Sequence, residues 1–203
     1  MDLNVNVLVL SPCSSDKKYD PNIDCEIIDE HPRDELVQQY NDIVAPAAEM
    51  YTGDEHVHVK KAVERLRDLA TVDWYIISAG FGLLESDTEI PAYDCTFRKE
   101  EIEQVRMRAK RFGYDIDDLT NDETIQAVGH EMGIPQAFTD VLNHEYDILF
   151  VVLGEAYLLS VTDALTEIPD QTTAYAFAAE GTKDLIGDCE WVPATKTERQ
   201  ALE

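Results

Sequence analysis

Short runs of alternating or continuous apolar residues recur along the chain, and each run predicts a β-strand. These runs cover residues 4–10, 73–79, 147–153 and 172–178, with a weaker last one at 189–193. Between them, apolar residues recur at the three- and four-residue spacing of an amphipathic helix. The helices predicted in this way cover residues 33–44, 54–70, 98–112, 122–131, 135–143 and 155–165.

Strands that alternate with helices are typical of a mainly parallel sheet covered by helices on both faces. We therefore expect a three-layer α/β/α fold with a sheet of about four to five strands. Residues 11–31 and 90–97 are predicted as loops. No internal repeat, low-complexity tract or linker divides the chain, so we expect a single α/β domain over residues 1–203.

Charge changes this picture, because 42 acidic residues against 16 basic ones leave a formal net charge of −26. Such a surface excludes a generally basic nucleic-acid-binding protein and argues against docking on anionic membranes. At molar ionic strength the Debye length falls to roughly 3 Å, so salt screens the self-repulsion of an acidic surface. We therefore expect a halophilic protein that is less stable in dilute buffer.

The sequence also predicts a cytoplasmic protein. The N-terminus has no basic flank followed by a long apolar run, and no stretch approaches 18 uninterrupted apolar residues, so neither a signal peptide nor a membrane span is expected. The cysteines lie far apart and form no Cys-x-x-Cys pair: Cys13, Cys25, Cys95 and Cys189. This spacing predicts free thiols in a reducing compartment.

No metal or other cofactor is predicted. A zinc site built from Cys13, Cys25 and His31 remains a minor alternative, because the spacing matches no structural zinc pattern. His56 and His58 alternate before a predicted helix and leave a metal at that point open. None of the histidines is predicted to be catalytic, and the sequence predicts no oligomeric state.

In a parallel sheet the ligand site lies beyond the carboxyl ends of the strands. Residues 11–19, 78–84, 154–157 and 179–183 follow predicted strands and carry small, glycine or polar residues. Such loops admit a polar ligand, although βα turns favour Gly and Ser for structural reasons as well. The residues predicted to contact a substrate are Ser11, Cys13, Lys18, Tyr19, Ser78, Gly80, Phe81, Gly82, Tyr93, Gly154 and Tyr157.

Residues beside these loops are predicted to be catalytic. Asp94 and Glu155 are the carboxylates best placed to orient a water molecule or protonate a leaving group. Lys17 follows the first strand and would bind a phosphate or stabilise a departing base. For Glu155 a structural role stays open, because a carboxylate at a helix start is favourable electrostatically.

Cys13 stands four positions before Lys17 and has two candidate roles. A neighbouring lysine and backbone N–H groups favour a thiolate, which would make Cys13 a nucleophile. The other role is a close-packed wall of the pocket. We favour the wall, because water and a carboxylate can cleave a glycosidic bond without sulfur.

The loops also carry a resemblance to known proteins. The string Pro12-Cys13-x3-Lys17-x-Tyr19, the segment 51-YTG-53 and the segment 73-DWYIISAGFGLLESDTEIPAYD-94 together resemble a poorly characterised family of small α/β proteins. The resemblance covers roughly residues 5–97. Phe81 stands where that pattern has tyrosine, and Ala92 is inserted before Tyr93.

The first loop is also similar to part of the archaeosine synthase C-terminal region. Lys18, Asp20 and Cys25 stand where that region has Pro, Ser and His. The resemblance implies a uracil-DNA-glycosylase-like fold and an association with modified or deazapurine nucleobases. It fixes no reaction.

Contact with nucleic acid would need a local basic patch, and the sequence offers one. Six of the sixteen basic residues lie between Arg98 and Arg111. They would meet backbone phosphates if they faced solvent unpaired. The alternative is a solvated helix face whose cations pair with Glu101 and Glu103.

Two functions follow from these observations. The first is an enzyme that acts on a nucleobase or nucleoside, cleaving or modifying at the N-glycosidic bond of a modified, deazapurine-type base in nucleic acid. The second is a non-catalytic module that binds a nucleotide or modified base and acts through a partner. Both need a polar pocket lined by glycine, so acid–base residues facing the pocket would distinguish them.

Overall fold

The computed structural model describes residues 5–194, so Asn4, where the first predicted strand begins, lies outside the described residues. The strands are β1 (Asn6–Pro12), β2 (Val44–Pro46), β3 (Thr71–Ser78), β4 (Gly82–Glu85), β5 (Glu89–Pro91), β6 (Ile148–Val151), β7 (Thr173–Ala178) and β8 (Glu190–Pro193). The α-helices are α1 (Cys25–Glu30), α2 (Arg33–Gln39), α3 (Ala47–Met50), α4 (Asp54–Leu66), α5 (Ile102–Arg111), α6 (Asn121–Glu131), α7 (Ile134–Leu142) and α8 (Glu155–Leu159). Short 3-10 helices cover Asn41–Ile43, Lys99–Glu101, Thr162–Thr166 and Glu180–Leu185.

The main sheet has six strands in the order β4-β3-β1-β6-β7-β8, and every neighbouring pair except β3–β4 is parallel. The mainly parallel α/β fold predicted from the sequence is therefore confirmed, with one strand more than expected. The additional strand is β4. Gly82, its first residue, has a φ of 75°, which lets the chain turn back on β3, so that Ser78 pairs with Gly82. A separate two-stranded sheet joins β2 to β5.

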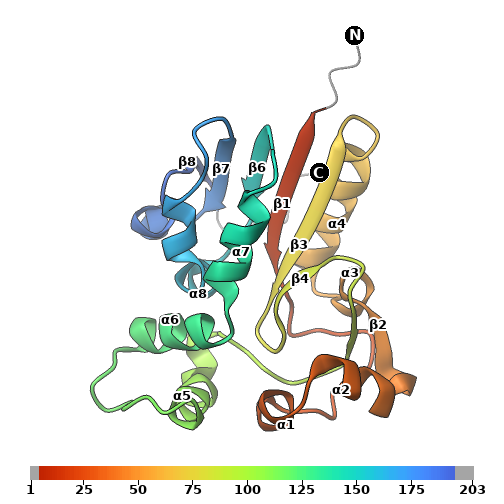
Figure 1. Ribbon diagram of the computed structural model, residues 1–203, viewed down its shortest axis with the longest axis vertical. Helices are drawn as coiled ribbons and strands as arrows, with labels where there is room; N and C mark the ends of the chain where they lie inside the picture. Colours follow the sequence, from red (N-terminus) through yellow and green to blue (C-terminus); the bar gives the residue numbers. More distant parts are fainter. Residues whose placement is uncertain (1–4, 195–203) are drawn as a thin grey trace.

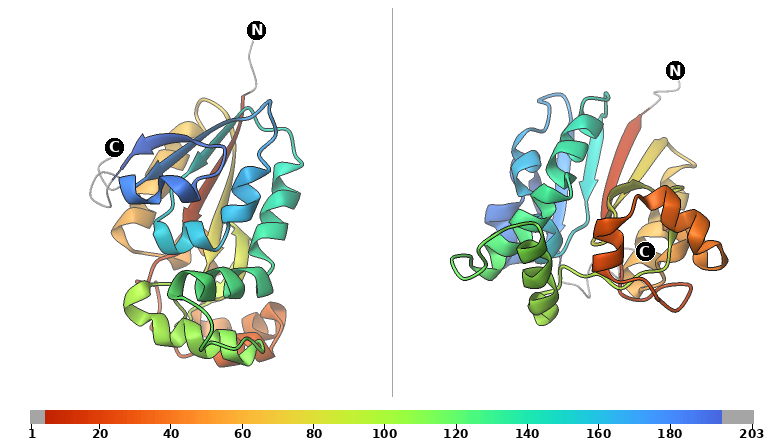
Figure 2. Two further views of the ribbon diagram at one scale, coloured as in Figure 1. Left: turned by 90° about the vertical axis from the view of Figure 1, so that its left-hand side faces the viewer. Right: turned by 60° about the horizontal axis from the view of Figure 1, so that its bottom comes forward.

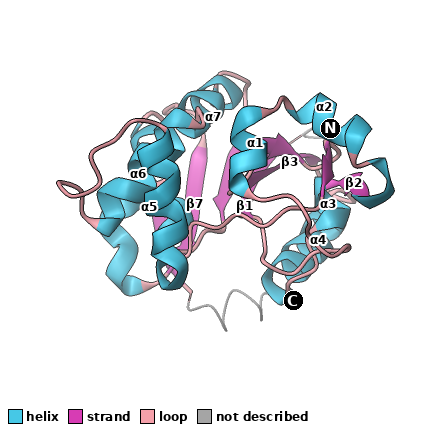
Figure 3. Cartoon of the chain, turned by 90° about the horizontal axis from the view of Figure 1, so that it is seen from below, coloured by secondary structure: helices cyan, strands magenta, loops and turns pink. Residues whose placement is uncertain are grey.

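Helices lie on both faces of the main sheet (Figures 1 and 2). The long helix α4 packs on one face against β1 and β3, whereas α7 and α8 lie on the opposite face. Seen from below, α1 and α2 flank one side of the carboxyl ends of the strands, and α5 and α6 flank the other (Figure 3). The end of the sheet where a ligand would bind is therefore bordered by helical segments on both sides.

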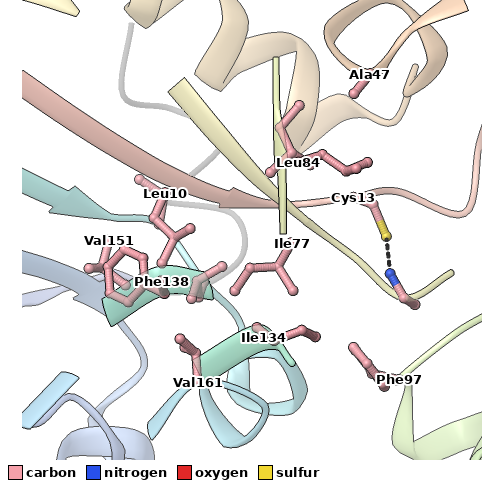
Figure 4. Packing of buried hydrophobic residues seen from close by; sticks show 14 of the residues in the cluster. Leu10, Cys13, Ala47, Ile77, Leu84, Phe97, Ile134, Phe138, Val151 and Val161 are labelled. Atoms are coloured by element: carbon pink, nitrogen blue, oxygen red, sulfur yellow. Dashed lines mark hydrogen bonds between the residues drawn. The ribbon is translucent and has the colours of Figure 1, made fainter. Parts of the chain in front are cut away.

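The core lies between the central strands and α7. Leu10, Ile77 and Val151 come from β1, β3 and β6, and they meet Phe138 and Ile134 of α7 (Figure 4). Each of the five side chains is completely buried. A central parallel strand is covered on both faces, which explains why β1 reads as a nearly continuous apolar run.

The first predicted loop contains a helix that the sequence pattern did not reveal. Asp24 caps α1, because its side chain accepts hydrogen bonds from the backbone N–H groups of Glu26 and Ile27. The helix has six residues and buries only Cys25 and Ile28, so it shows too little periodicity to be predicted. The predicted helix over 155–165 is divided instead: α8 ends at Leu159 and a 3-10 helix follows.

The cysteine prediction was wrong for one pair. Cys25 and Cys95 form a disulfide, with their Cα atoms 5.4 Å apart, whereas Cys13 and Cys189 are free and buried. The backbone bridge between Asp24 and Asp94 brings the two cysteines together across 70 residues of sequence. Sequence spacing alone does not reveal such a long-range contact.

No helix among residues 5–194 is long and apolar enough to cross a bilayer. Within the same residues, no group of three or more His, Cys, Asp or Glu side chains is arranged to hold a metal ion. The alternative zinc site has lost one of its ligands in any case, because Cys25 is bonded to Cys95.

Candidate functional site

The direction in which the chain adds successive strands to the sheet reverses between β1 and β6. From β1 the chain proceeds to β3 and β4 on one side, and then returns to place β6, β7 and β8 on the other. At such a topological switch point the two loops leaving the carboxyl ends diverge and leave a crevice, which is where open α/β sheets bind ligands. The structure does have a cleft there.

The cleft has a volume of about 490 Å³, within the size range of small-molecule sites. Four segments line it: the loop after β1, the start of α4, the residues that precede α5, and the start of α8. The lining residues are Pro12, Cys13, Ser14, Ser15, Asp16, Gly53, Asp54, Glu55, His56, Arg98, Lys99, Glu100, Gly154, Glu155, Ala156 and Tyr157. Four of the residues predicted for the site are among them: Cys13, Gly154, Glu155 and Tyr157.

Cys13 connects the cleft to the interior. Its side chain is 7% exposed, and its Sγ lies 3.1 Å from the hydroxyl of Tyr157. The backbone N–H of Ala79 donates to the same sulfur over 3.5 Å (Figure 4). The end of β1, the turn after β3 and the start of α8 therefore meet at this sulfur. The sulfur is therefore closely packed, and the wall role favoured for Cys13 stays a prediction.

Glu155 and Lys99 form an ion pair at the rim of the cleft. The Lys99 ammonium lies 3.1 Å from a Glu155 carboxylate oxygen and 2.6 Å from Asp122. These hydrogen bonds raise the pKa of Lys99, the one to Asp122 most, so that Lys99 keeps its charge. Asp94, the other predicted catalytic carboxylate, is exposed and does not line the cleft. The two carboxylates are therefore not brought together.

Lys17 does not face the cleft either. Its Nζ donates to the carbonyls of Ser14 and Ser15 over 3.3 Å each and lies 4.5 Å from the centre of the Tyr93 ring. Burial lowers the pKa of Lys17, and the charges of Cys13, Asp94 and Asp16 oppose that shift. In the structure Lys17 holds its own loop closed over Tyr93, which differs from the predicted contact with a ligand.

Ser78 and Tyr93 belong to a buried hydroxyl cluster together with Tyr51. Ser78 Oγ accepts from the N–H groups of Gly80 and Phe81, so its own hydroxyl is left to donate to Tyr93 over 2.6 Å. Tyr93 in turn lies 2.8 Å from the Tyr51 hydroxyl. Burial raises the pKa values of Tyr51 and Tyr93 well above the usual value for tyrosine. The cluster is therefore neutral, and it lies in the interior beneath the site.

The remaining predicted contact residues lie outside the cleft lining. Ser11 accepts from the Trp74 indole over 2.8 Å inside the sheet, and the Tyr93 ring packs directly over Gly80. A Cβ at Gly80 would lie 2.7 Å from that ring, so glycine is required there. Phe81, Gly82, Lys18 and Tyr19 lie outside the cleft lining, with Lys18 over the Tyr19 ring.

His56 is a cleft residue that the sequence pattern did not single out as functional. It is 2% exposed, its Nε2 pairs with the Ala48 carbonyl, and its Nδ1 has no hydrogen-bond partner. Burial lowers the pKa of His56 to about 4, so the ring is neutral at pH 7. The ring packs against Tyr51 and Trp74, with ring centroids 5.5 and 5.1 Å away, so His56 lies within the wall of the cleft. The only sequence signal was the His56-x-His58 pair.

The basic segment between Arg98 and Arg111 is not an open cationic surface. Arg98 pairs with Glu101 and Lys99 with Glu155, while Arg106 donates to backbone carbonyls of the loop after α5. Arg108 is 3% exposed and, like Arg111, binds Asp29. Lys110 is exposed. Carboxylates thus pair with four of the six cations and backbone carbonyls hold Arg106, which leaves Lys110 as the exposed cation of this segment. The segment therefore offers little free cationic charge to a phosphate backbone.

Part of the chain matches a known protein family. Residues 36–131 match the model of a family of unknown function, DUF6884, so that part of the chain, from α2 to α6, is similar to that family. The matched segment supplies the α4 and Arg98–Glu100 sides of the cleft but neither Cys13 nor Glu155. Comparison with curated proteins and with solved structures found no match.

Proposed function

We propose that this protein is an enzyme that acts on a nucleobase or nucleoside at its N-glycosidic bond, and that the substrate binds in the cleft between the ends of β1 and β6. The observation that carries the proposal is the Glu155–Lys99 ion pair, which lines this cleft beside Tyr157. A carboxylate can orient water, an ammonium can stabilise a departing base, and an aromatic ring can stack on that base.

The roles can be written as one balanced step. Glu155 accepts a proton from a water molecule, whose oxygen forms a bond to the anomeric carbon of the sugar as the bond to the base nitrogen breaks. The electron pair of that bond stays on the base, and the Lys99 ammonium supplies the proton that neutralises it. Lys99 thus takes the role that the sequence assigned to Lys17, which is engaged within its own loop.

A second candidate function is a binding module that recognises a base or nucleoside without cleaving it. The exposed position of Asp94 outside the cleft favours this candidate, because the second carboxylate of the predicted pair is then missing.

The test is release of free base, measured by chromatography after incubation in molar KCl. The substrates are the common nucleosides, 7-deazaguanosine, and oligonucleotides that contain modified bases. We expect release, and we expect Glu155→Gln to slow it by about a hundredfold or more. Asp94→Asn is the matched control, being an exposed carboxylate outside the cleft, and should retain activity.

The outcomes separate the two candidates. Saturable binding of a nucleoside without release of base would favour the binding module. Release that persists undiminished in the double variant Asp94→Asn, Glu155→Gln would refute the carboxylate mechanism. Neither binding nor release with any substrate would refute both functions.

A further inference from the structure

Lys99 joins the first turns of two helices. Its ammonium lies 2.6 Å from a carboxylate oxygen of Asp122 in α6 and 3.1 Å from one of Glu155 in α8. Lys99 and Glu155 line the cleft, whereas Asp122 does not. The step proposed above uses the first two groups and gives no role to Asp122.

The start of α6 holds Asp122 in a fixed place. Thr120 and Glu123 form a capping box, in which each side chain accepts a hydrogen bond from the backbone N–H of the other. Arg106 of α5 donates to two carbonyl groups of the loop that precedes α6. Glu123 is thus engaged at the helix start, and Asp122 is the first-turn carboxylate of α6 that pairs with Lys99.

Lys99 depends on this second carboxylate for its orientation. A lysine side chain has a flexible four-carbon stem, so a single contact fixes its ammonium poorly. Asp122 and Glu155 come from different helices, and together they confine the ammonium to the space between them. These two carboxylates are the charged groups that raise the pKa of Lys99, the hydrogen bond to Asp122 most, while burial opposes the shift. Without Asp122, the ammonium would therefore move more freely and would lose its proton at a lower pH.

We propose that Asp122 is a positioning residue of the cleft, which holds the Lys99 ammonium against Glu155. On the basis of the proposed function, Asp122 acts on the reaction through Lys99 and does not touch the substrate, because it lies outside the cleft lining. The alternative is an ion pair that only links α6 to the segment before α5. Exposed ion pairs of that kind contribute little to stability, so the test needs measurements that a structural link would not change.

The first experiment measures the pKa of Lys99 and needs no ligand. A trace of acetic anhydride acetylates neutral amines: the nitrogen forms a bond to a carbonyl carbon, acetate leaves, and the amine proton goes to the buffer. The rate at Lys99 is followed by mass spectrometry from about pH 8 to 12, in about 0.1 M KCl, where screening is weaker than at molar salt. The midpoint of the rate against pH reports the pKa, whereas a change of access alters only the plateau. Lys110, an exposed lysine of α5, is the internal reference.

Asp122→Asn should lower the midpoint of Lys99 and leave that of Lys110 unchanged. At about pH 9, Lys99 should then react at least about threefold faster than in the unmodified protein. Asp122→Glu keeps the charge and should keep the midpoint of Lys99 nearly unchanged. The matched control Asp170→Asn removes the same charge from an exposed position before β7, at the other end of the sheet, and should shift neither lysine. Asp122 is half-exposed, so the variants should fold.

The second experiment follows the release of base in molar KCl. In Asp122→Asn we expect kcat to fall by about tenfold and KM to change by less than about threefold, since no contact with the substrate is lost. The alkaline limb of the pH profile should move to lower pH, because Lys99 loses its proton earlier. Asp122→Glu should recover most of kcat, and Asp170→Asn should behave like the unmodified protein.

Several results would overturn the proposal. These are an unchanged midpoint of Lys99 in Asp122→Asn, an equal shift in Asp170→Asn, and a kcat and pH profile that do not respond to Asp122→Asn. The two experiments also keep this inference separate from the proposed function. If the midpoint of Lys99 falls as expected but no substrate releases base, the proposed function fails while the hold of Asp122 on Lys99 stands. If base is released and Asp122→Asn changes nothing, the proposed function stands and the positioning role is refuted.

Discussion

The buried ion pair between Arg108 and Asp29 is the interaction whose loss we expect to destabilise the protein most. Arg108 is 3% exposed, and its Nε lies 2.9 and 3.1 Å from the two carboxylate oxygens of Asp29. The same guanidinium donates to the carbonyls of Ala79 and Gly80, directly after β3. Arg108→Met would keep much of the side-chain volume and remove all of these donors.

The magnitude follows from what is left behind. Removing one partner of a buried ion pair costs about 3–5 kcal/mol, because the other charge stays buried. Arg111 still binds Asp29 over 3.0 Å and compensates part of that cost. The two carbonyls that lose their donor each add about 1 kcal/mol or more. We therefore expect the free energy of unfolding to fall by about 4 kcal/mol, a large share of a domain's total stability.

Urea unfolding at a fixed KCl concentration measures this loss. The matched control is Lys110→Met, which removes an exposed cation from the same helix and should change stability by less than about 0.5 kcal/mol. The double variant Arg108→Met, Asp29→Leu should recover part of the loss, since no buried charge then remains. A decrease below about 1 kcal/mol in Arg108→Met would refute the reasoning.

Further predictions concern pH, packing and salt. Burial holds the pKa of His56 at about 4, below its usual 6.5, so stability is lost as the pH falls from 6.5 to 4, where the unfolded chain gains a proton that the folded chain refuses. We measure the free energy of unfolding in urea at several pH values across this range. Between pH 6.5 and 4 it should fall by about 3 kcal/mol less in His56→Gln than in the unmodified protein, and equal decreases would contradict a lowered pKa of His56. Gly129→Ala should cost about 1–3 kcal/mol in urea unfolding, because its Cβ would lie 2.8 Å from the Ser160 carbonyl oxygen. Gly181→Ala, where the new Cβ meets no atom within 4 Å, is its control, and equal losses would count against the packing argument. The melting temperature should rise as KCl is raised from about 0.1 M to molar concentrations, and a flat dependence would remove the basis for calling the protein halophilic.

The strands of the sheet were predictable because each buries a short apolar run whose pattern is local. Residues 73–79 and 172–178, for instance, correspond closely to β3 and β7. The antiparallel strand β4 was not predicted, because it depends on the positive φ of Gly82, and glycine is equally compatible with an ordinary loop. Propensity and periodicity carry no information on such a reversal.

The candidate site was predictable to the level of loops but not of side chains. The loops after β1 and β6 do meet, as the topology of a parallel sheet requires, and they place Cys13 and Tyr157 in contact. Whether a loop residue faces the cleft or the interior depends on packing between distant segments. Lys17 turns toward Tyr93 for this reason, and the disulfide of Cys25 with Cys95 depends on a bridge between two loops.

The central position of β1 also constrains how the chain reaches its native state during synthesis. Asn6 lies at the start of β1, and the backbone N–H of Asn6 donates to the side chain of Asp147, 141 residues further along the chain. At about 5–20 residues per second, a ribosome needs roughly 7–28 s to produce that intervening length. During this interval one edge of this strand, in which every residue after Asn6 is buried in the folded protein, is unpaired, and such an edge is prone to intermolecular association. The cleft likewise forms only after Glu155 has emerged, because the start of α8 is the last along the chain of the four segments that line it.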